Sequence, residues 1–338
     1  MSHPPPLLAL DNIQITFNTD EGGLTAVDGV SFELHAGEML GLVGESGCGK
    51  SITCKSIMGL LPTPNGHLSA GAIRFKGEDL AKASPRRMRE VRGDDIGMIF
   101  QDPMTALNPV LTVGFQIMEA IAQHRRMPRQ EQRALAIEIL ERVGIPSPHT
   151  RIDDYPHQLS GGMRQRVMIA MALALNPGVL IADEPTTALD VTIQAQILAL
   201  MNQLRKDQNT GVLLITHDLG VVAEVCDRVV VMYAGKVVEV GTVEEIFHSP
   251  SHPYTIRLLD SIPKAGSRKA GQRQERLATI PGRVPDLREL PKGCRFQARC
   301  HKVDPLCAQS EPELRPWEQN PGQLTRCHFP GTPREPSA

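Results

Sequence analysis

A glycine-rich segment near the N-terminus has the residue types and spacing of a phosphate-binding loop. Residues 44–51 read Gly-Glu-Ser-Gly-Cys-Gly-Lys-Ser, which fits the pattern G-x-x-x-x-G-K-[ST]. Glycines let backbone N–H groups curve around phosphates, and a helix that begins at the loop presents its positive end to them. Lys50 would reach the β- and γ-phosphates, and the Ser51 hydroxyl would coordinate Mg²⁺. The segment therefore predicts a nucleoside triphosphate site.

Two carboxylates close an apolar run later in the chain. The run Val-Leu-Ile-Ala at 179–182 is followed by Asp183 and Glu184. At the end of a buried strand, Asp183 can hold Mg²⁺ through water, and Glu184 can polarise an attacking water as a general base. An Asp-Glu pair on its own is usually a solvated acidic turn. The catalytic interpretation therefore depends on the phosphate loop.

The order of the motifs resembles that of ABC ATPases. Residues 159–163, Leu-Ser-Gly-Gly-Met, resemble the signature motif LSGGQ, with Met163 where Gln is usual, and they lie between the phosphate loop and the acidic strand end. The likeness covers about residues 7–250. It implies an ATPase in which two cassettes pair head to tail, so that each ATP lies between one phosphate loop and the other cassette's signature.

The resemblance also implies roles for single residues. Gln101 is similar to the glutamine that contacts Mg²⁺ and water, and His217 to the switch histidine at the γ-phosphate, so that both join Glu184 in the catalytic set. Phe17 is similar to the aromatic residue that stacks on adenine; its alternative is a core position in a strand. The implied ATP and Mg²⁺ contacts are Phe17, Gly44, Ser46, Gly47, Cys48, Gly49, Lys50, Ser51, Ile52, Gln101 and Asp183. The implied contacts to the partner's ATP are Ser160, Gly161, Gly162 and Asp190.

Further stretches resemble the ATPases of dipeptide and oligopeptide importers, namely residues 100–109, 155–158, 190–196 and 252–255. The resemblance implies import of short peptides with two membrane permease subunits, a second, homologous ABC ATPase in a heterodimer, and an extracytoplasmic peptide-binding protein. The chain would lie on the cytoplasmic face of the inner membrane. Importers of nickel, glutathione and other small solutes share this subfamily, so the identity of the solute stays open.

Four of the seven cysteines gather in a Pro-rich tail with little apolar content: Cys294, Cys300, Cys307 and Cys327. A metal site could supply the stability that hydrophobic burial does not. Four thiolates suit zinc or an iron–sulfur cluster, and these spacings are wider than the C-x₂₋₄-C pairs of zinc sites. The importer resemblance implies a [4Fe–4S] cluster. Zinc, a mixed site with His301 or His328, and plain reduced cysteines stay open.

Two expectations concern the phosphate loop itself. Because the loop and the tail are far apart in the sequence, we expect ATP binding at Lys50 to be independent of the tail. Cys48 lies beside Lys50 and a helix N-terminus, both of which favour a reactive thiolate. The alternative is that Cys48 only replaces a small residue such as Ser.

The elements around these motifs alternate between apolar runs and helical patterns. Short strand-like runs fill residues 7–43, and the last leads into the phosphate loop. Helical periodicity follows from about 105 to 166, and apolar runs at 179–183 and 212–216 flank another helical pattern. This alternation indicates buried parallel strands in an α/β fold. A hairpin is expected around Ala234 and Gly235.

The alternation predicts an α/β fold, and the resemblance to ABC ATPases implies a P-loop NTPase of the ABC cassette type, with a RecA-like core, an N-terminal antiparallel β part and a helical subdomain. The cassette takes residues 1–250, with the helical subdomain at about 103–166, and an irregular extension with the four cysteines takes 251–338.

Composition narrows the function further. The 338 residues carry a net charge of −2, which does not indicate the basic footprint of a nucleic-acid-binding protein. No stretch approaches the roughly 20 apolar residues that span a bilayer, and the first residues do not resemble a signal peptide. We expect a cytosolic chain with reduced thiols. A soluble ABC ATPase acting on nucleic acid is the less favoured alternative, because the chain has one cassette and no coiled-coil heptads.

Overall fold

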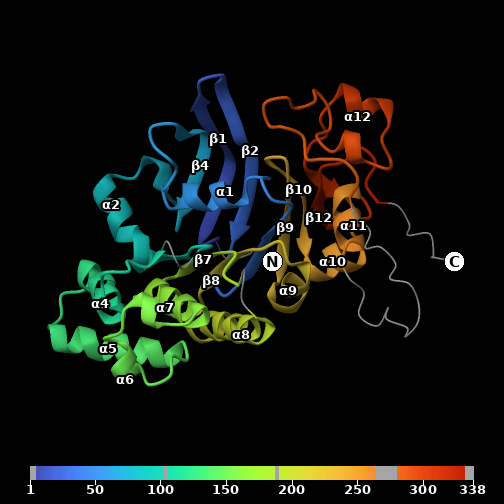
Figure 1. The fold of residues 1–338 in the computed structure, drawn as a ribbon. Coiled ribbons are helices and arrows are strands. Elements are labelled where there is room, and N and C mark those ends of the chain that lie inside the picture. The colour runs from blue at the N-terminus through green and yellow to red at the C-terminus, as the bar shows by residue number, and fades with distance from the viewer. Residues whose placement is uncertain (1–4, 103–105, 187–189, 263–279, 332–338) are drawn as a thin grey trace, which may run out of the picture.

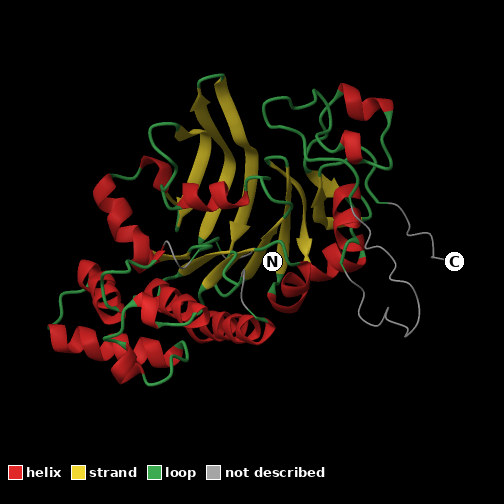
Figure 2. Ribbon diagram, in the orientation of Figure 1, coloured by secondary structure: helices red, strands yellow, loops and turns green. Residues whose placement is uncertain are grey.

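The computed structural model describes residues 5–102, 106–186, 190–262 and 280–331, and these residues form two sheets covered by helices. Figure 2 shows the strands running through the middle of the molecule with helices around them. A four-stranded antiparallel sheet has the order β2-β1-β4-β5. Its strands are β1 (Leu8–Thr19), β2 (Gly22–Leu34), β4 (Gly66–Phe75) and β5 (Glu78–Asp79).

The second sheet has eight strands in the order β11-β12-β10-β9-β3-β8-β7-β6. From β6 to β9 the neighbouring strands are parallel, and from β9 to β11 they are antiparallel. Every residue of β3, β6, β7 and β8 is buried, which explains why these strands read as unbroken apolar runs. The strands are β3 (Met39–Val43), β6 (Ile96–Ile99), β7 (Val179–Asp183), β8 (Gly211–Ile215), β9 (Arg228–Tyr233), β10 (Lys236–Thr242), β11 (Arg315–Trp317) and β12 (Asn320–Thr325). The α/β prediction and the hairpin between β9 and β10 are confirmed.

The helices fall into three groups (Figure 1). Four of them gather at one end of the molecule as the helical part: α4 (Val113–His124), α5 (Arg129–Arg142), α6 (Pro148–Arg151) and α7 (Gly161–Leu173). Helices of the core and its margins are α1 (Lys50–Ile57), α2 (Pro85–Glu90), α8 (Val191–Gln208), α9 (Leu219–Val225) and α10 (Val243–His248). The last two, α11 (Pro253–Asp260) and α12 (Pro305–Gln309), belong to the C-terminal extension. Short turns complete the set: η1 (Leu80–Lys82), η2 (Val91–Asp95), η3 (Pro156–Gln158) and η4 (Gln297–Arg299).

The extension, described at residues 251–262 and 280–331, is more regular than its sequence suggests. Strand β12 pairs antiparallel with β10, and β11 pairs with β12, so that the extension adds two strands to the core sheet. The two strands contain Pro316 and Pro321 and show no clear apolar alternation, so periodicity gave no signal for them. The expectation of an irregular extension is therefore wrong at this hairpin.

A buried carboxylate fastens the extension to the core. Glu239 of β10 is fully buried, and its Oε1 accepts hydrogen bonds from the Ser251 N–H at 2.6 Å, the Ser251 hydroxyl at 2.7 Å and the Gln323 amide at 2.6 Å. Its Oε2 accepts from the His252 N–H at 3.0 Å. Buried polar groups are stable only when they are paired in this way. The start and the end of the extension thus meet at one core side chain.

None of the helices in the described ranges combines the length and the apolar character needed to cross a bilayer.

Candidate functional site

The phosphate loop joins the buried strand β3 to helix α1. Gly44 has a φ of +150°, and a Cβ there would lie 2.2 Å from the Met232 carbonyl oxygen. Gly49, with a φ of +104°, is the residue before the first turn of α1. Both positions need glycine, one for space and both for backbone conformation. The glycine spacing in the sequence therefore reflects the path of the loop.

Lys50 lies inside this loop. Its side chain is buried, and the ammonium donates to the carbonyl oxygens of Gly44 at 2.7 Å and Glu45 at 3.0 Å. A more distant contact of 3.7 Å reaches the Cys48 sulfur. The positive charge is thus held within the curve of the loop, where it favours an anionic ligand.

Helix α1 and strand β7 bring the second pair of residues together. The Ser51 hydroxyl donates to Asp183 Oδ1 at 3.0 Å, although the residues are 132 positions apart. Asp183 is the last residue of β7 and is 3% exposed. Burial raises the pKa of its carboxyl group, while the hydrogen bond from Ser51 opposes that shift. A hydroxyl and a carboxylate side by side offer the oxygen ligands that Mg²⁺ prefers.

Three neighbouring strands place a second cluster around Glu184. Gln101 follows β6, Glu184 follows β7 and His217 follows β8. The Gln101 amide donates to Glu184 Oε2 at 3.0 Å, and His217 Nδ1 lies 3.3 Å from Glu184 Oε1. The carboxyl ends of parallel strands are where α/β folds bind ligands. The structure therefore brings the three expected catalytic residues together beside the Mg²⁺ candidates.

The signature residues begin helix α7. Ser160 is its N-cap, and the Ser160 hydroxyl accepts a hydrogen bond from the Met163 N–H at 3.3 Å. Ser160 and Gly161 are both exposed. Met163 takes part in the cap through its backbone, so the replacement of the usual glutamine leaves the cap in place.

Asp190 lies close to the signature. It caps α8 by accepting a hydrogen bond from the Ile193 N–H at 2.9 Å. A Cβ on Gly162 would lie 3.5 Å from the Ile193 side chain, so the starts of α7 and α8 are in contact. The residues just before Asp190, at 187–189, and the importer-like residues 103–105 lie outside the described ranges.

Three other predicted ATP contacts occupy different settings. Phe17 of β1 is half-buried, packs against the core, and has its ring against Gly66 of β4. Ser46 is exposed in the loop, and Ile52 of α1 packs partly buried against the core. Cys48 is 1% exposed, and burial raises the pKa of its thiol despite the nearby Lys50 ammonium. The expectation of a reactive Cys48 thiolate is therefore wrong, because desolvation outweighs the neighbouring charge.

The four cysteines of the extension line a single cavity, which His252 and His328 also line. The Cys294 N–H donates to the Cys307 carbonyl oxygen at 2.7 Å, and a Cβ on Gly293 would lie 2.1 Å from that oxygen. Three of the sulfurs accept hydrogen bonds from the backbone N–H two residues later: Cys294, Cys300 and Cys327.

The four thiols of the cavity form no disulfide bonds. Burial raises the pKa of Cys294 to about 11 and that of Cys327 to about 12. In the described parts of the chain, no three His, Cys, Asp or Glu side chains are arranged to hold a metal ion. The four thiols thus share one cavity, but their sulfurs are not arranged around a common metal position. His328 Nε2 lies 3.0 Å from the Ser310 carbonyl oxygen instead.

Sequence reasoning missed one set of residues at the phosphate loop. Arg299, beside Cys300, pairs through both terminal nitrogens with Glu45 in the loop, and Tyr254 of α11 accepts a hydrogen bond from the Glu45 N–H at 2.9 Å. The extension therefore contacts the phosphate loop, although the two segments are far apart in the sequence; the independence of ATP binding from the tail stays a prediction. No local sequence pattern predicts an ion pair between residues 254 positions apart. The only signal in the sequence was that Glu45 and Arg299 carry opposite charges.

Comparisons with known proteins agree with this architecture. Residues 27–187 match the profile of the ABC transporter family, and residues 238–307 match that of the oligopeptide/dipeptide transporter C-terminal region. The dipeptide transport ATP-binding protein DppD of Bacillus subtilis is 53% identical over 90% of this chain and 90% of its own length. The protein of the same description from Escherichia coli is 48% identical over 96% of this chain and 97% of its own length.

Solved structures show the same cassette. An ATP-binding cassette dimer in a post-hydrolysis state, bound to ADP and Pi, has a TM-score of 0.63 and 30% identity, and covers 70% of this chain and 98% of that chain. ABC transporter ATP-binding proteins thus share the cassette fold of this chain, and the peptide-transport ones also share its extension. The chain belongs to the ABC transporter family and is an ATPase of its oligopeptide/dipeptide transporter branch.

Proposed function

We propose that this ATPase powers the import of dipeptides and oligopeptides through a membrane ABC transporter. The observation that carries the proposal is similarity over nearly the whole chain, extension included, to ATP-binding proteins described as serving dipeptide transport. Two membrane permease subunits, a second homologous ATPase and an extracytoplasmic peptide-binding protein complete the transporter. The chain then lies on the cytoplasmic face of the inner membrane.

The geometry supports a division of labour in ATP hydrolysis. Lys50 and the loop N–H groups would hold the phosphates, and Ser51 with Asp183 would hold Mg²⁺, which would supply charge compensation there. Glu184 orients the attacking water and accepts its proton, because its carboxylate lies between Gln101 and His217. Hydrogen bonds from both sides hold that carboxylate in one position.

The signature completes the site of a second cassette. Ser160, Gly161 and Gly162 begin a helix whose N-terminal N–H groups suit an anion, and the first two are exposed to a partner. Asp190 lies beside them at the start of α8. In a head-to-tail dimer this surface closes over the partner's ATP, so that ATP binding joins the two cassettes and hydrolysis separates them. Phe17 is assigned to the adenine of the chain's own ATP.

The extension is assigned a [4Fe–4S] cluster held by its four cysteines, with zinc as the alternative. The donor set supports the assignment: four thiols line one cavity, and backbone N–H groups donate to three of the sulfurs, as they do around thiolate-bound metals. Binding requires the sulfurs to rotate toward a common centre. No step of ATP hydrolysis uses an electron, so the cluster has a structural role.

Co-purification and uptake test the transport proposal. The tagged chain, extracted with its membranes in mild detergent, is expected to carry two polytopic membrane proteins and a second ATPase. Reconstituted vesicles should then accumulate labelled dipeptide when ATP and the binding protein are supplied. Uptake of nickel or glutathione without peptide uptake would show that the transporter imports a different solute. Co-purification with nucleic acid or ribosomes would overturn the transport proposal.

Metal analysis tests the extension separately. Protein purified without oxygen should be brown, absorb broadly near roughly 400 nm and contain about four irons per chain. Each Cys→Ser change at the four positions should lose iron and loosen the extension to protease. One zinc and no iron would assign the site to zinc, and four freely titrating thiols without metal would leave only reduced cysteines.

A further inference from the structure

Arg299 is a buried arginine of the extension whose two terminal nitrogens reach the phosphate loop of the ATPase core. Its side chain is 3% exposed, and its two terminal nitrogens pair with the Glu45 carboxylate at 2.5 and 2.9 Å. The remaining contacts are to the carbonyl oxygens of Pro281 at 3.1 Å and Ile280 at 3.3 Å, and to the Tyr233 hydroxyl at 3.4 Å. The Glu45 side chain is 29% exposed, so the pair is partly buried, and its bidentate geometry fixes both partners in orientation as well as in place.

Glu45 is held at each of its polar groups. Its carboxylate binds Arg299, and its N–H donates to the hydroxyl of the fully buried Tyr254 at 2.9 Å. Its carbonyl oxygen accepts from the Lys50 ammonium at 3.0 Å and from the Cys48 N–H at 3.3 Å. Because Glu45 follows Gly44 at the entrance of the phosphate loop, the extension fixes the loop from behind through Arg299 and Tyr254.

The charge of Glu45 gives the pair a second consequence. A carboxylate within a phosphate loop repels an incoming triphosphate, and partial burial of the Glu45 side chain reduces the screening of that repulsion by water. The Arg299 guanidinium compensates the charge and turns the carboxylate toward the extension. Without Arg299, the loop would carry an unpaired negative charge beside the phosphates.

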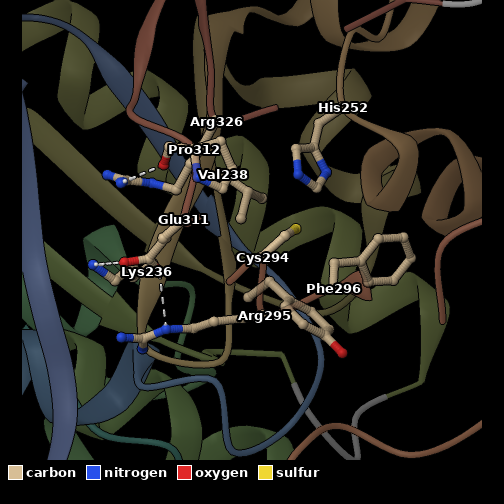
Figure 3. A pocket seen from close by; sticks show the side chains of 10 residues that line it. Lys236, Val238, His252, Cys294, Arg295, Phe296, Glu311, Pro312 and Arg326 are labelled. Atoms are coloured by element: carbon tan, nitrogen blue, oxygen red, sulfur yellow. Dashed lines mark hydrogen bonds and ion pairs between the residues drawn. The ribbon is translucent and has the colours of Figure 1, made fainter. Parts of the chain in front are cut away.

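A second arginine of the same segment reaches the back of the loop. Arg295, beside Cys294, donates to the Ala234 carbonyl oxygen at 2.6 Å and forms an ion pair with Asp28. It also approaches Glu311 within 3.3 Å, next to the Cys294 side chain (Figure 3). The Gly235 N–H, one residue beyond Ala234, donates to the Cys48 carbonyl oxygen at 3.0 Å. The cysteine-bearing segment therefore contacts the loop directly through Arg299, and Arg295 binds the β9–β10 turn that in turn contacts the loop.

We propose that Arg299 is a positioning residue for nucleotide binding: by pairing with Glu45 it holds the phosphate loop in its binding conformation and removes a repulsive charge from it. Through this pair the extension sets the affinity of the cassette for ATP. The inference rests on the assignment of residues 44–51 as the ATP-binding loop.

Binding of a nonhydrolysable ATP analogue, AMP-PNP with Mg²⁺, to the full chain tests this role by calorimetry. Arg299→Ala should raise the dissociation constant about 10-fold, as expected when a partly buried carboxylate loses its charged partner. In the assembled transporter, KM for ATP should rise while kcat changes less than about threefold. Arg299→Ala/Glu45→Gln should recover at least about fivefold of the lost affinity, because the repulsive charge is gone.

Two control variants separate positioning from general damage. Arg288→Ala removes an exposed arginine of the same extension, which pairs with Asp286 and Glu21 at the surface, and should leave the dissociation constant unchanged. Lys50→Ala should abolish binding. Normal binding by Lys50→Ala would refute the site assignment, whereas loss in Lys50→Ala with wild-type binding in Arg299→Ala would refute only the role of Arg299.

The double variant Arg299→Ala/Glu45→Gln distinguishes charge compensation by Arg299 from a purely structural role. A double variant that binds as weakly as Arg299→Ala would make Arg299 a packing residue and overturn the proposal. If Arg299→Ala does not fold, Arg299→Lys and Glu45→Gln take its place, since the first keeps the charge without the two-pronged geometry. Wild-type affinity in both of these would equally overturn it, and a loss of about 3–10-fold in Arg299→Lys would support it.

Discussion

The ATP site and the extension hold their functional side chains in place by different means. At the ATP site the three catalytic candidates lie within two positions of a buried strand end: Gln101 after β6, Glu184 after β7, and His217 after β8. In the extension, long-range polar contacts take over, such as the four hydrogen bonds to Glu239 and the pair between Arg299 and Glu45. A site set by local backbone can be read from spacing, whereas one set by distant partners cannot.

The largest effect should come from a change that leaves both regions folded. Glu184→Gln removes the expected general base while Lys50 and Ser51 keep their contacts. Steady-state ATP hydrolysis by the assembled transporter should fall about 10²–10⁴-fold, with ATP binding preserved. Retention of more than half of the wild-type turnover would show that another group accepts the proton. It would also show that the residues at these strand ends do not form the whole catalytic site.

A single methyl group should disturb the extension selectively. Gly293→Ala would place a Cβ 2.1 Å from the Cys307 carbonyl oxygen, so the hydrogen bond from the Cys294 N–H must break. We expect a loss of about 1–3 kcal/mol in unfolding free energy and earlier protease cleavage in the extension.

Gly178→Ala is the matched control, because its Cβ would meet only the Asp95 carbonyl oxygen at 3.8 Å. Equal protease resistance of Gly293→Ala and Gly178→Ala would show that the close approach at Gly293 does not stabilise the extension.

Acid should weaken the attachment of the extension through His252. Burial lowers the pKa of His252 from 6.5 to about 3, and His252 Nδ1 accepts the Tyr254 N–H at the start of α11. Because the unfolded chain binds the proton first, stability should fall as pH drops from 6.5 toward 3, by about 1.4 kcal/mol per pH unit.

His252→Asn retains a helix-capping side chain without a titrating group. Urea midpoints measured between pH 7 and pH 5 should therefore decline less steeply in this variant than in the wild type. Parallel slopes would mean that His252 is protonated freely in the folded state.

The last prediction concerns Cys48. Because the thiol is buried and burial raises its pKa, N-ethylmaleimide should modify it at pH 7 at least about 100-fold more slowly in the folded protein than in urea. Mass spectrometry of peptides from timed samples gives both rates. Fast modification in the folded state would mean that the phosphate loop opens readily and that local backbone structure does not hold the ATP site rigidly.

Features formed by adjacent residues could be predicted from the sequence, whereas features that depend on distant contacts could not. The glycine spacing, the unbroken apolar runs of β3, β7 and β8, and the paired carboxylates after β7 carry their structure in a few adjacent residues. The strands β11 and β12 are short and contain proline, and their place in the sheet depends on β10, about 80 residues earlier. For Cys48, neighbouring charge was visible in the sequence but burial was not, and burial decides.

The separation of 254 positions between Glu45 and Arg299 also has a consequence for biosynthesis. A ribosome adds about 5–20 residues per second, so the phosphate loop waits roughly 10–50 seconds for the arginine that braces it. A nascent chain that folds domain by domain therefore completes its cassette core before the loop acquires its partner. Chains released early by a truncated message would contain every nucleotide-binding motif and still lack a fully braced site, which limits the ATP that unfinished subunits can consume.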